Sequence, residues 1–170
     1  MRGAPFTEQE AYRAAERFGF NCGPAALCAV TGLRPEEAID RLHGFERKRY
    51  TNPSMMQRAL RDLGIGFERV YQCLGLSKAR EPKYPEFGLV RVQWGGPWTE
   101  PGVPVRARYS HTHWIACDRG EVFDVNAISW GGWIARWEWE QRLVPWLLEQ
   151  VEPKASGEWW PTHCWQVLLS

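Results

Sequence analysis

The chain has 170 residues, enough to form one domain with a sizeable hydrophobic core, and we expect a single domain over residues 1–170. Its formal net charge of +1 gives no sign of the strongly basic surface that binds nucleic acids or membranes. No apolar run approaches the roughly 20 residues of a membrane-spanning helix, and the first residues lack the apolar segment of a signal peptide. We therefore expect neither a nucleic-acid nor a membrane partner.

The 5 cysteines are an odd number, and no two of them are spaced as Cys-x-x-Cys. This pattern argues against a zinc site, a redox pair or a framework of disulfides. Reduced thiols are typical of proteins in a reducing compartment, so the sequence predicts a cytoplasmic location. It implies no metal and no organic cofactor.

The first part of the chain, about residues 1–65, is predicted to be helical. Thr7 and Glu10 form a capping box, and Asn52 followed by Pro53 is a strong helix start. The helix that begins at Cys22 is apolar on all sides, which indicates a helix buried in the domain. The predicted helices cover residues 7–18, 22–32, 35–42 and 52–63.

The second part, about residues 66–170, is rich in valine and aromatic residues and is predicted to form a mainly antiparallel sheet. A helix is expected over residues 138–150, interrupted at Pro145. Residues 95–110 hold several prolines and glycines, and we expect a long loop that borders a functional cleft. The order of helices and then strands favours an α+β fold. The predicted strands cover residues 67–73, 89–94, 114–117, 122–128 and 164–169.

Cys22 is the strongest candidate for a catalytic residue in the sequence. Asn21 before it is a good N-cap, and Pro24 fits a first helical turn. A thiol at a helix N-terminus feels the positive end of the helix dipole, which favours the thiolate. Because the thiolate is the nucleophilic form, this position suits covalent catalysis.

A nucleophilic thiol needs a base, and His113 is the best placed of the four histidines. It precedes a predicted strand that turns back at Asp118-Arg119-Gly120. In a hairpin centred on that turn, Asn126 lies opposite His113 and Asp124 lies diagonally on the same face. Either side chain could orient the histidine, so the residues alone leave the third member of a triad open between them.

The blocks Cys22-Gly23-Pro24-Ala25-Ala26-Leu27, His113-Trp114-Ile115-Ala116 and Val122-Phe123-Asp124-Val125-Asn126 resemble the papain-like cysteine peptidases. They are most similar to the branch of bacteriocin-processing peptidases that cleave double-glycine leaders. The resemblance implies N-terminal helices, including a central buried one, packed on a mainly antiparallel sheet. It also implies Cys22 as nucleophile, His113 as base and Asp124 as the group that orients the base.

The sequence departs from this family at one position. The family usually has a glutamine about six residues before the cysteine, where it donates a hydrogen bond to the oxyanion, and this chain has Glu16. An ionised carboxylate cannot donate a hydrogen bond, although Asn21 or the Cys22 backbone amide could do so. Loss of one oxyanion donor typically slows an enzyme by about 100- to 1000-fold.

The predicted function is that of a cysteine peptidase or related amide-bond hydrolase acting on a peptide or protein. One alternative is a peptidoglycan amidase or endopeptidase of phage or bacterial origin. Another is a catalytically inactive papain-like binding protein, which Glu16 favours. Among the 11 tryptophans, Trp94, Trp98 or Trp130 could wall a substrate cleft. The papain-like resemblance implies a tryptophan that shields the histidine and its carboxylate from water, and Trp130 is the closest in sequence to that role.

Overall fold

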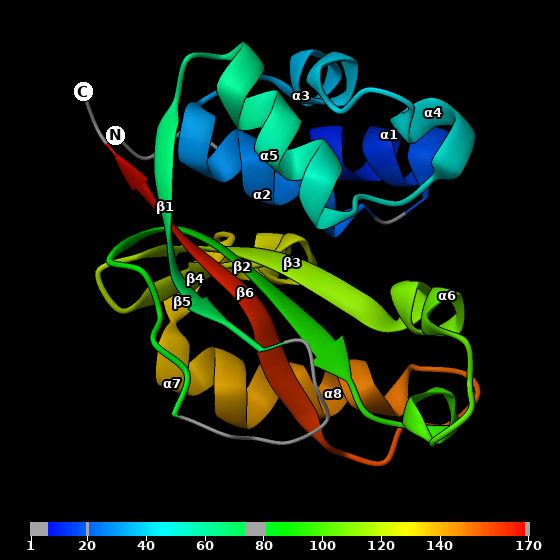
Figure 1. Cartoon of the computed structure of the whole chain (residues 1–170). Helices are drawn as coiled ribbons and strands as arrows, with labels where there is room; N and C mark the ends of the chain where they lie inside the picture. The colour runs from blue at the N-terminus through cyan, green and yellow to red at the C-terminus, as the bar shows by residue number, and fades with distance from the viewer. Residues whose placement is uncertain (1–6, 20, 74–80, 169–170) are drawn as a thin grey trace.

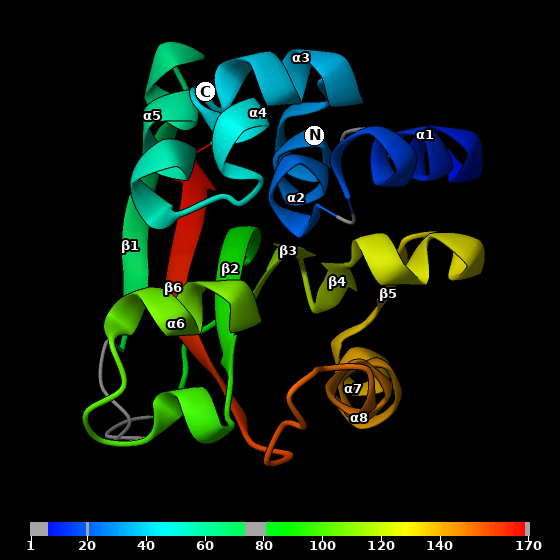
Figure 2. The same cartoon turned by 90° about the vertical axis from the view of Figure 1, so that its right-hand side faces the viewer.

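The computed structural model describes residues 7–19, 21–73 and 81–168, in which helices and strands form three layers (Figure 1). Helices α1 to α5 cover one face of a sheet, and a helix that contains α7 and α8 covers the opposite face (Figures 1 and 2). The fold is therefore mixed, with helices packed on an antiparallel sheet as the sequence predicts. Among the helices of these residues, none has both the length and the apolar character that crossing a membrane requires.

The first layer forms where the sequence has helix signals. The Thr7 hydroxyl accepts a hydrogen bond from the Glu10 backbone N–H at 3.2 Å, and the Asn52 side chain accepts one from the Met55 N–H at 2.9 Å. These bonds satisfy donors that a helix start leaves unpaired. The layer comprises α1 (Glu8–Phe18), α2 (Cys22–Thr31), α3 (Pro35–Arg41), α4 (Phe45–Lys48) and α5 (Pro53–Asp62).

Helix α2 is the centre of this layer. Every residue from Gly23 to Val30 is buried, which confirms the prediction of a buried central helix. The helix ends at Thr31 and is capped by Gly32, whose φ of 75° is the left-handed conformation that glycine adopts without strain. Helix α2 packs directly on strand β3, so its first residue lies close to the sheet (Figures 1 and 2).

In the described residues, six strands form one antiparallel sheet in the order β1-β6-β2-β3-β4-β5. Strand β2 lies in its interior between β6 and β3, and every residue of β2 is buried. The strands are β1 (Gly66–Gln72), β2 (Phe87–Trp94), β3 (Thr112–Asp118), β4 (Glu121–Phe123), β5 (Trp133–Ala135) and β6 (Trp159–Leu168).

The sheet separates two hydrophobic cores because successive side chains of a strand point to opposite faces. Leu89 packs with Trp114 and Trp165 in the core beneath α2, whereas Val90 and Val92 belong to the core on the other face. After α7 (Arg136–Glu138), which has no buried residue, the π-helical turn η4 (Trp139–Leu143) and α8 (Val144–Glu149) close that second core. The helix is not interrupted at Pro145, which lies in the first turn of α8, where a missing N–H is tolerated. Its irregular turn is the π-helical one, which ends at Leu143.

Several predicted boundaries were wrong. Residues 95–110 are not an irregular loop, because they contain the helical segments η1 (Pro97–Thr99), α6 (Val105–Arg108) and the start of η2 (Tyr109–His111). The strand predicted over 122–128 ends at Phe123 and is followed by the 3-10 helix η3 (Val125–Trp130). Strand β5 and helix α4 were not predicted. The last residue of the strand predicted over 164–169 lies outside the described residues.

The close pairing of β2 with β6 leads to a stability prediction. A methyl group at Gly88 would collide with the backbone carbonyl oxygen of Trp165, which cannot move without disturbing the sheet. We expect Gly88→Ala to lower the free energy of unfolding by about 3 kcal/mol, as measured by urea denaturation. Gly66→Ala is the matched control, since its methyl group would lie 3.4 Å from the Leu168 side chain, an ordinary contact. Equal stabilities of the two variants would contradict the prediction.

Candidate active site

The Cys22 thiol lies half-buried at the first residue of α2, as the sequence predicts. Asn21 occupies the N-cap position, but its side chain makes no capping hydrogen bond and instead donates to the Gly19 carbonyl oxygen at 2.8 Å. The first intrahelical bond runs from the Ala25 N–H to the Asn21 carbonyl oxygen. By helix geometry, the N–H groups of Cys22 and Gly23 therefore have no partner within the helix.

The start of α2 fits closely against its neighbours. A methyl group at Gly23 would collide with the side chain of Thr51, so only glycine allows the approach. The Thr51 carbonyl oxygen accepts a hydrogen bond at 2.9 Å from the indole N–H of Trp114 on β3. The segment before α5 thus joins the start of α2 to the strand that carries His113.

His113 is buried near the start of β3, with 7% of its surface exposed. Its Nε2 lies 2.7 Å from Oδ2 of Asp124, and its side chain is also hydrogen-bonded to Cys22. Because Nε2 faces the carboxylate, the other ring nitrogen, Nδ1, is the one available to the thiol. The Trp94 ring stacks beside the imidazole, with ring centres 5.8 Å apart. These contacts hold the imidazole between a thiol and a carboxylate.

Asp124 is fully buried, and both of its carboxylate oxygens accept hydrogen bonds. Oδ2 accepts from the Trp139 indole N–H at 2.8 Å and faces His113, while Oδ1 accepts from the Asn126 backbone N–H at 2.8 Å and side-chain amide at 2.9 Å. The geometry therefore places Asp124, not Asn126, against the histidine. Asn126 lies behind the carboxylate and holds it in place.

The hairpin explains why the two candidates differ. Ala116 pairs with Phe123 and Asp118 with Glu121, which is the register inferred from the turn. Asn126 nevertheless does not lie opposite His113, because the Asp124 side chain bonds to the Asn126 N–H and turns the chain out of the sheet. Such side-chain turns are typical of aspartate. The register was correct, and the predicted length of the strand was wrong.

Electrostatics favour an ion pair between Cys22 and His113. Burial alone would raise the pKa of Cys22, but the charge of His113 and hydrogen bonds from His113 and from the Trp114 backbone lower it. Burial opposes the charged form of His113 too, yet Asp124 and Cys22 raise its pKa well above the usual range. The pKa of Asp124 is lowered, because His113, Trp139 and Asn126 outweigh its burial. These shifts favour the thiolate of Cys22, the imidazolium of His113 and the carboxylate of Asp124.

The other predicted site residues lie elsewhere. Trp130 is 51% exposed and packs under the Arg142 guanidinium, so it does not have the predicted place beside His113 and Asp124. Trp94 and Trp139 have that place instead. Trp139 was missed because it lies 15 residues beyond Asp124, and only its helix brings the indole back to the carboxylate. Glu16 has an exposed side chain in α1.

The other three histidines, His43, His111 and His163, lie in surroundings that differ from those of His113. His43 is exposed and lies 3.0 Å from the Asp62 carboxylate. His111 stacks on Trp98 with ring centres 3.5 Å apart, and burial lowers its pKa. His163 is buried on β6, where burial and the charges of Arg91 and Arg69 lower its pKa to about 4. His113 is thus the histidine that contacts both a thiol and a carboxylate.

Comparisons with known proteins identify no relative of this chain. The chain matches no protein-family model, and no curated protein or solved structure shows significant similarity to it. The argument for a function therefore depends on the geometry and electrostatics of these residues.

The pKa shift of Cys22 predicts selective alkylation. Cys28, Cys117 and Cys164 are buried, and burial raises the pKa of each thiol, whereas the pKa of Cys22 is lowered. At pH 6, well below the usual thiol pKa of about 8.5, iodoacetamide should modify Cys22 first. Reactivity should be lost only when the pH falls through the lowered pKa. Peptide mass spectrometry that finds equal labelling of all four thiols would contradict the prediction.

The contacts of Asp124 predict different effects for two substitutions. In Asp124→Asn, the new NH₂ group must face donors, and the charge that holds the His113 proton is lost. We expect a loss of stability of about 1–3 kcal/mol and about tenfold slower alkylation of Cys22 at pH 6. Asn126→Ala removes one side-chain donor and keeps the backbone N–H. It should change both quantities clearly less, and the reverse order would show that Asn126 orients the base.

Proposed function

We propose that the protein is a cysteine peptidase or a related amide-bond hydrolase with a papain-like arrangement, and that Cys22, His113 and Asp124 are its catalytic triad. The observation that carries the proposal is the continuous chain of hydrogen bonds from Cys22 through His113 to Asp124 at the start of a buried helix. A thiol on a helical layer that meets a histidine and a carboxylate on an antiparallel sheet is consistent with the papain-like resemblance of the sequence motifs. A reduced thiol is required, which fits a cytoplasmic location.

In the proposed mechanism the Cys22 thiolate attacks the carbonyl carbon of the substrate amide. A bond forms between sulfur and carbon, and the carbonyl electron pair moves onto oxygen. The oxyanion then collapses, the C–N bond breaks, and the His113 imidazolium gives its proton to the leaving amine. The product of this half-reaction is a thioester between Cys22 and the acyl part of the substrate.

In the second half-reaction, neutral His113 takes a proton from a water molecule, which attacks the thioester. The C–S bond then breaks with its electron pair left on sulfur, the acid is released, and the proton taken from water stays on His113, which restores the pair of thiolate and imidazolium. Asp124 keeps the imidazole oriented through Nε2 and stabilises its positive charge in both halves. Trp139 and Trp94 contribute by excluding water from the contact between the imidazole and the carboxylate.

The oxyanion needs hydrogen-bond donors near Cys22. The backbone N–H groups at the start of α2 supply them, because they have no partner within the helix and lie at the positive end of its dipole. The side-chain amide hydrogen that Asn21 donates to the Gly19 carbonyl oxygen is not available to the oxyanion. Glu16 is exposed and as a carboxylate donates no hydrogen bond. Because the glutamine side-chain donor of the family is missing, we expect turnover about 100- to 1000-fold below that of an enzyme with both donors.

Glu16 also favours a second candidate function, a binding protein with the same fold and no turnover. In that case the triad would be a remnant, and Cys22 would form no thioester. Detection of a covalent acyl-enzyme therefore decides between the two candidates.

The test measures turnover on peptide mixtures and on purified peptidoglycan, with new chain ends identified by mass spectrometry. We expect the native protein to cleave one of them and to form an acid-trapped thioester at Cys22. Cys22→Ser and His113→Ala should each reduce turnover by more than about 1000-fold. Cys73→Ser, which changes a half-buried thiol beyond the end of β1, is the matched control and should retain activity. Cleavage that survives Cys22→Ser would overturn the assignment.

A further inference from the structure

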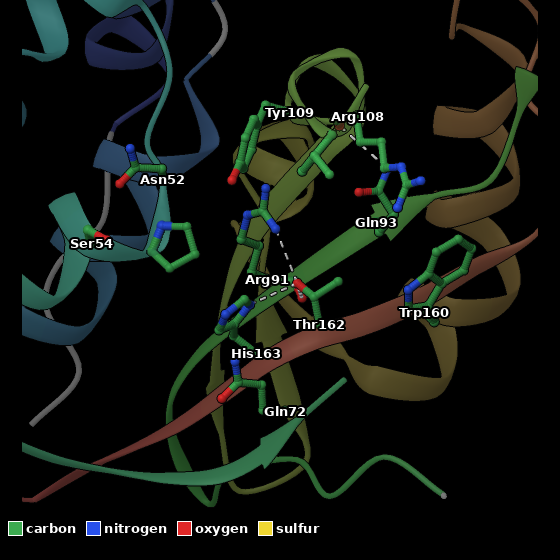
Figure 3. Close-up of a pocket in the computed structure, with 12 residues that line it drawn as sticks. Asn52, Ser54, Gln72, Arg91, Gln93, Arg108, Tyr109, Trp160, Thr162 and His163 are labelled. Carbon is green, nitrogen blue, oxygen red and sulfur yellow. Dashed lines mark hydrogen bonds between the residues drawn. The ribbon is translucent and has the colours of Figure 1, made fainter. Parts of the chain in front are cut away.

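A pocket next to Cys22 has an unusual charge. It has a volume of about 310 Å³ and lies between the sheet, the start of α5 and the segment of α6 and Tyr109 (Figure 3). Two arginines, Arg91 and Arg108, line this pocket, which we call the arginine pocket. None of the described residues that line it is acidic, and its other polar residues include Asn52, Gln93, Thr162 and His163.

Arg91 is the most unusual residue of the pocket. It belongs to β2 in the interior of the sheet and is only 5% exposed. Its Nη1 donates to the Thr162 hydroxyl at 3.3 Å, and its guanidinium lies over the Tyr109 ring at 5.5 Å (Figure 3). Its buried Nε has no hydrogen-bond partner in the described part of the chain. Burial lowers the pKa of Arg91 to about 10, so the group is still charged at neutral pH.

A buried positive charge normally lies against a carboxylate, because removing an ion from water costs several kcal/mol. Among the described residues, no carboxylate forms an ion pair with Arg91. Arg108 adds a second guanidinium whose buried Nε also has no partner there. His163 neither adds to nor offsets this positive charge, because a pKa of about 4 leaves it neutral at pH 7. The pocket is therefore positively charged, with unused donors.

The pocket adjoins the proposed nucleophile. Asn52, which lines it, follows Thr51, and the Thr51 side chain packs against Gly23, the residue after Cys22. Arg91 is paired across the sheet with Trp114, the residue after His113. The charge of Cys22 also acts on the pKa of Arg91, which requires the two groups to lie near each other. Cys22 does not itself line the pocket, but these relations place it near the pocket.

We propose that the arginine pocket binds a carboxylate of the substrate, so that the enzyme acts on amide bonds close to a negatively charged group. A carboxylate accepts two hydrogen bonds from a guanidinium, which supplies the acceptors that Arg91 and Arg108 lack. The carboxylate belongs either to an acidic side chain or to the end of a peptide chain. The substrate preference rests on the proposed function, whereas carboxylate binding by the pocket does not.

The first test compares two electrophiles that differ in charge. Iodoacetate and iodoacetamide both alkylate a thiolate with loss of iodide, but only iodoacetate carries a carboxylate. We expect the rate ratio of iodoacetate to iodoacetamide at Cys22 to fall about tenfold in Arg91→Met, as charge-assisted hydrogen bonds are lost. Arg106→Gln is the matched control, because it removes the same charge from an exposed position on α6 outside the pocket. Arg106→Gln leaves both Arg91 and His113 in place. It should therefore keep the rate ratio of the native protein.

The second test measures binding of acetylated peptides to the Cys22→Ser protein by calorimetry. One pair of peptides differs only in a free or amidated C-terminus, and the other differs only in an internal Glu or Gln. We expect the acidic member of one pair to bind at least about tenfold more tightly, and this preference to be lost in Arg91→Met and Arg108→Gln. A preference in the first pair identifies a chain end, and one in the second pair identifies a side chain.

The outcomes separate the two proposals. Arg91→Met fills the space of the arginine stem with an uncharged side chain, so this variant should keep the thermal midpoint of the native protein; if it does not fold, Arg108→Gln serves alone. An unchanged electrophile ratio together with no peptide preference would overturn the carboxylate site and leave the proposed hydrolase standing. A Cys22 that reacts with neither electrophile would overturn the hydrolase, and peptide binding would then decide the carboxylate site by itself.

Discussion

The candidate site depends on the hydrogen bonds that surround the buried carboxylate of Asp124. A negative charge with no exposed surface is stable only when donors or a positive charge surround it. His113, Trp139 and Asn126 provide these partners from β3, η4 and η3. Each partner is in turn fixed by the carboxylate. One buried charge thus sets the orientation of the imidazole and joins the helix of α7, η4 and α8 to the site.

The second constraint is the close contact between the helical layer and the sheet. Cys22 comes from the first layer, and His113 and Asp124 come from the sheet and the turn that follows it, so they meet only if α2 packs closely on β3. Gly23 and Thr51 make this approach possible, and the bond from Trp114 to the Thr51 carbonyl holds it. The arginine pocket opens along the same boundary, which explains how a charged pocket and a proposed nucleophile come to be neighbours.

Signals confined to a few neighbouring residues predicted much of the fold. The capping box of Thr7 and Glu10, the Asn52 cap and the apolar helix after Cys22 all appear as expected, because their hydrogen bonds and burial follow from local sequence. The turn after β3 also has the predicted register. The predictions were wrong where a side chain redirected the backbone, as Asp124 does when it ends β4. They were also wrong in the segment before β3, whose prolines and glycines concealed short helical turns.

The sequence by itself predicted the helical first part and the strand-rich second part, the place of Cys22 at a helix start and His113 as its partner, while the choice of Asp124 came from the family resemblance. These depend on local caps, on periodicity and on motifs short enough to recognise. Only the tertiary structure decided that Trp139 rather than Trp130 covers the carboxylate, and that Arg91 lies buried near the thiol with no carboxylate partner among the described residues. Such relations join residues far apart in the chain, and their energies depend on burial and on charges that no local pattern contains.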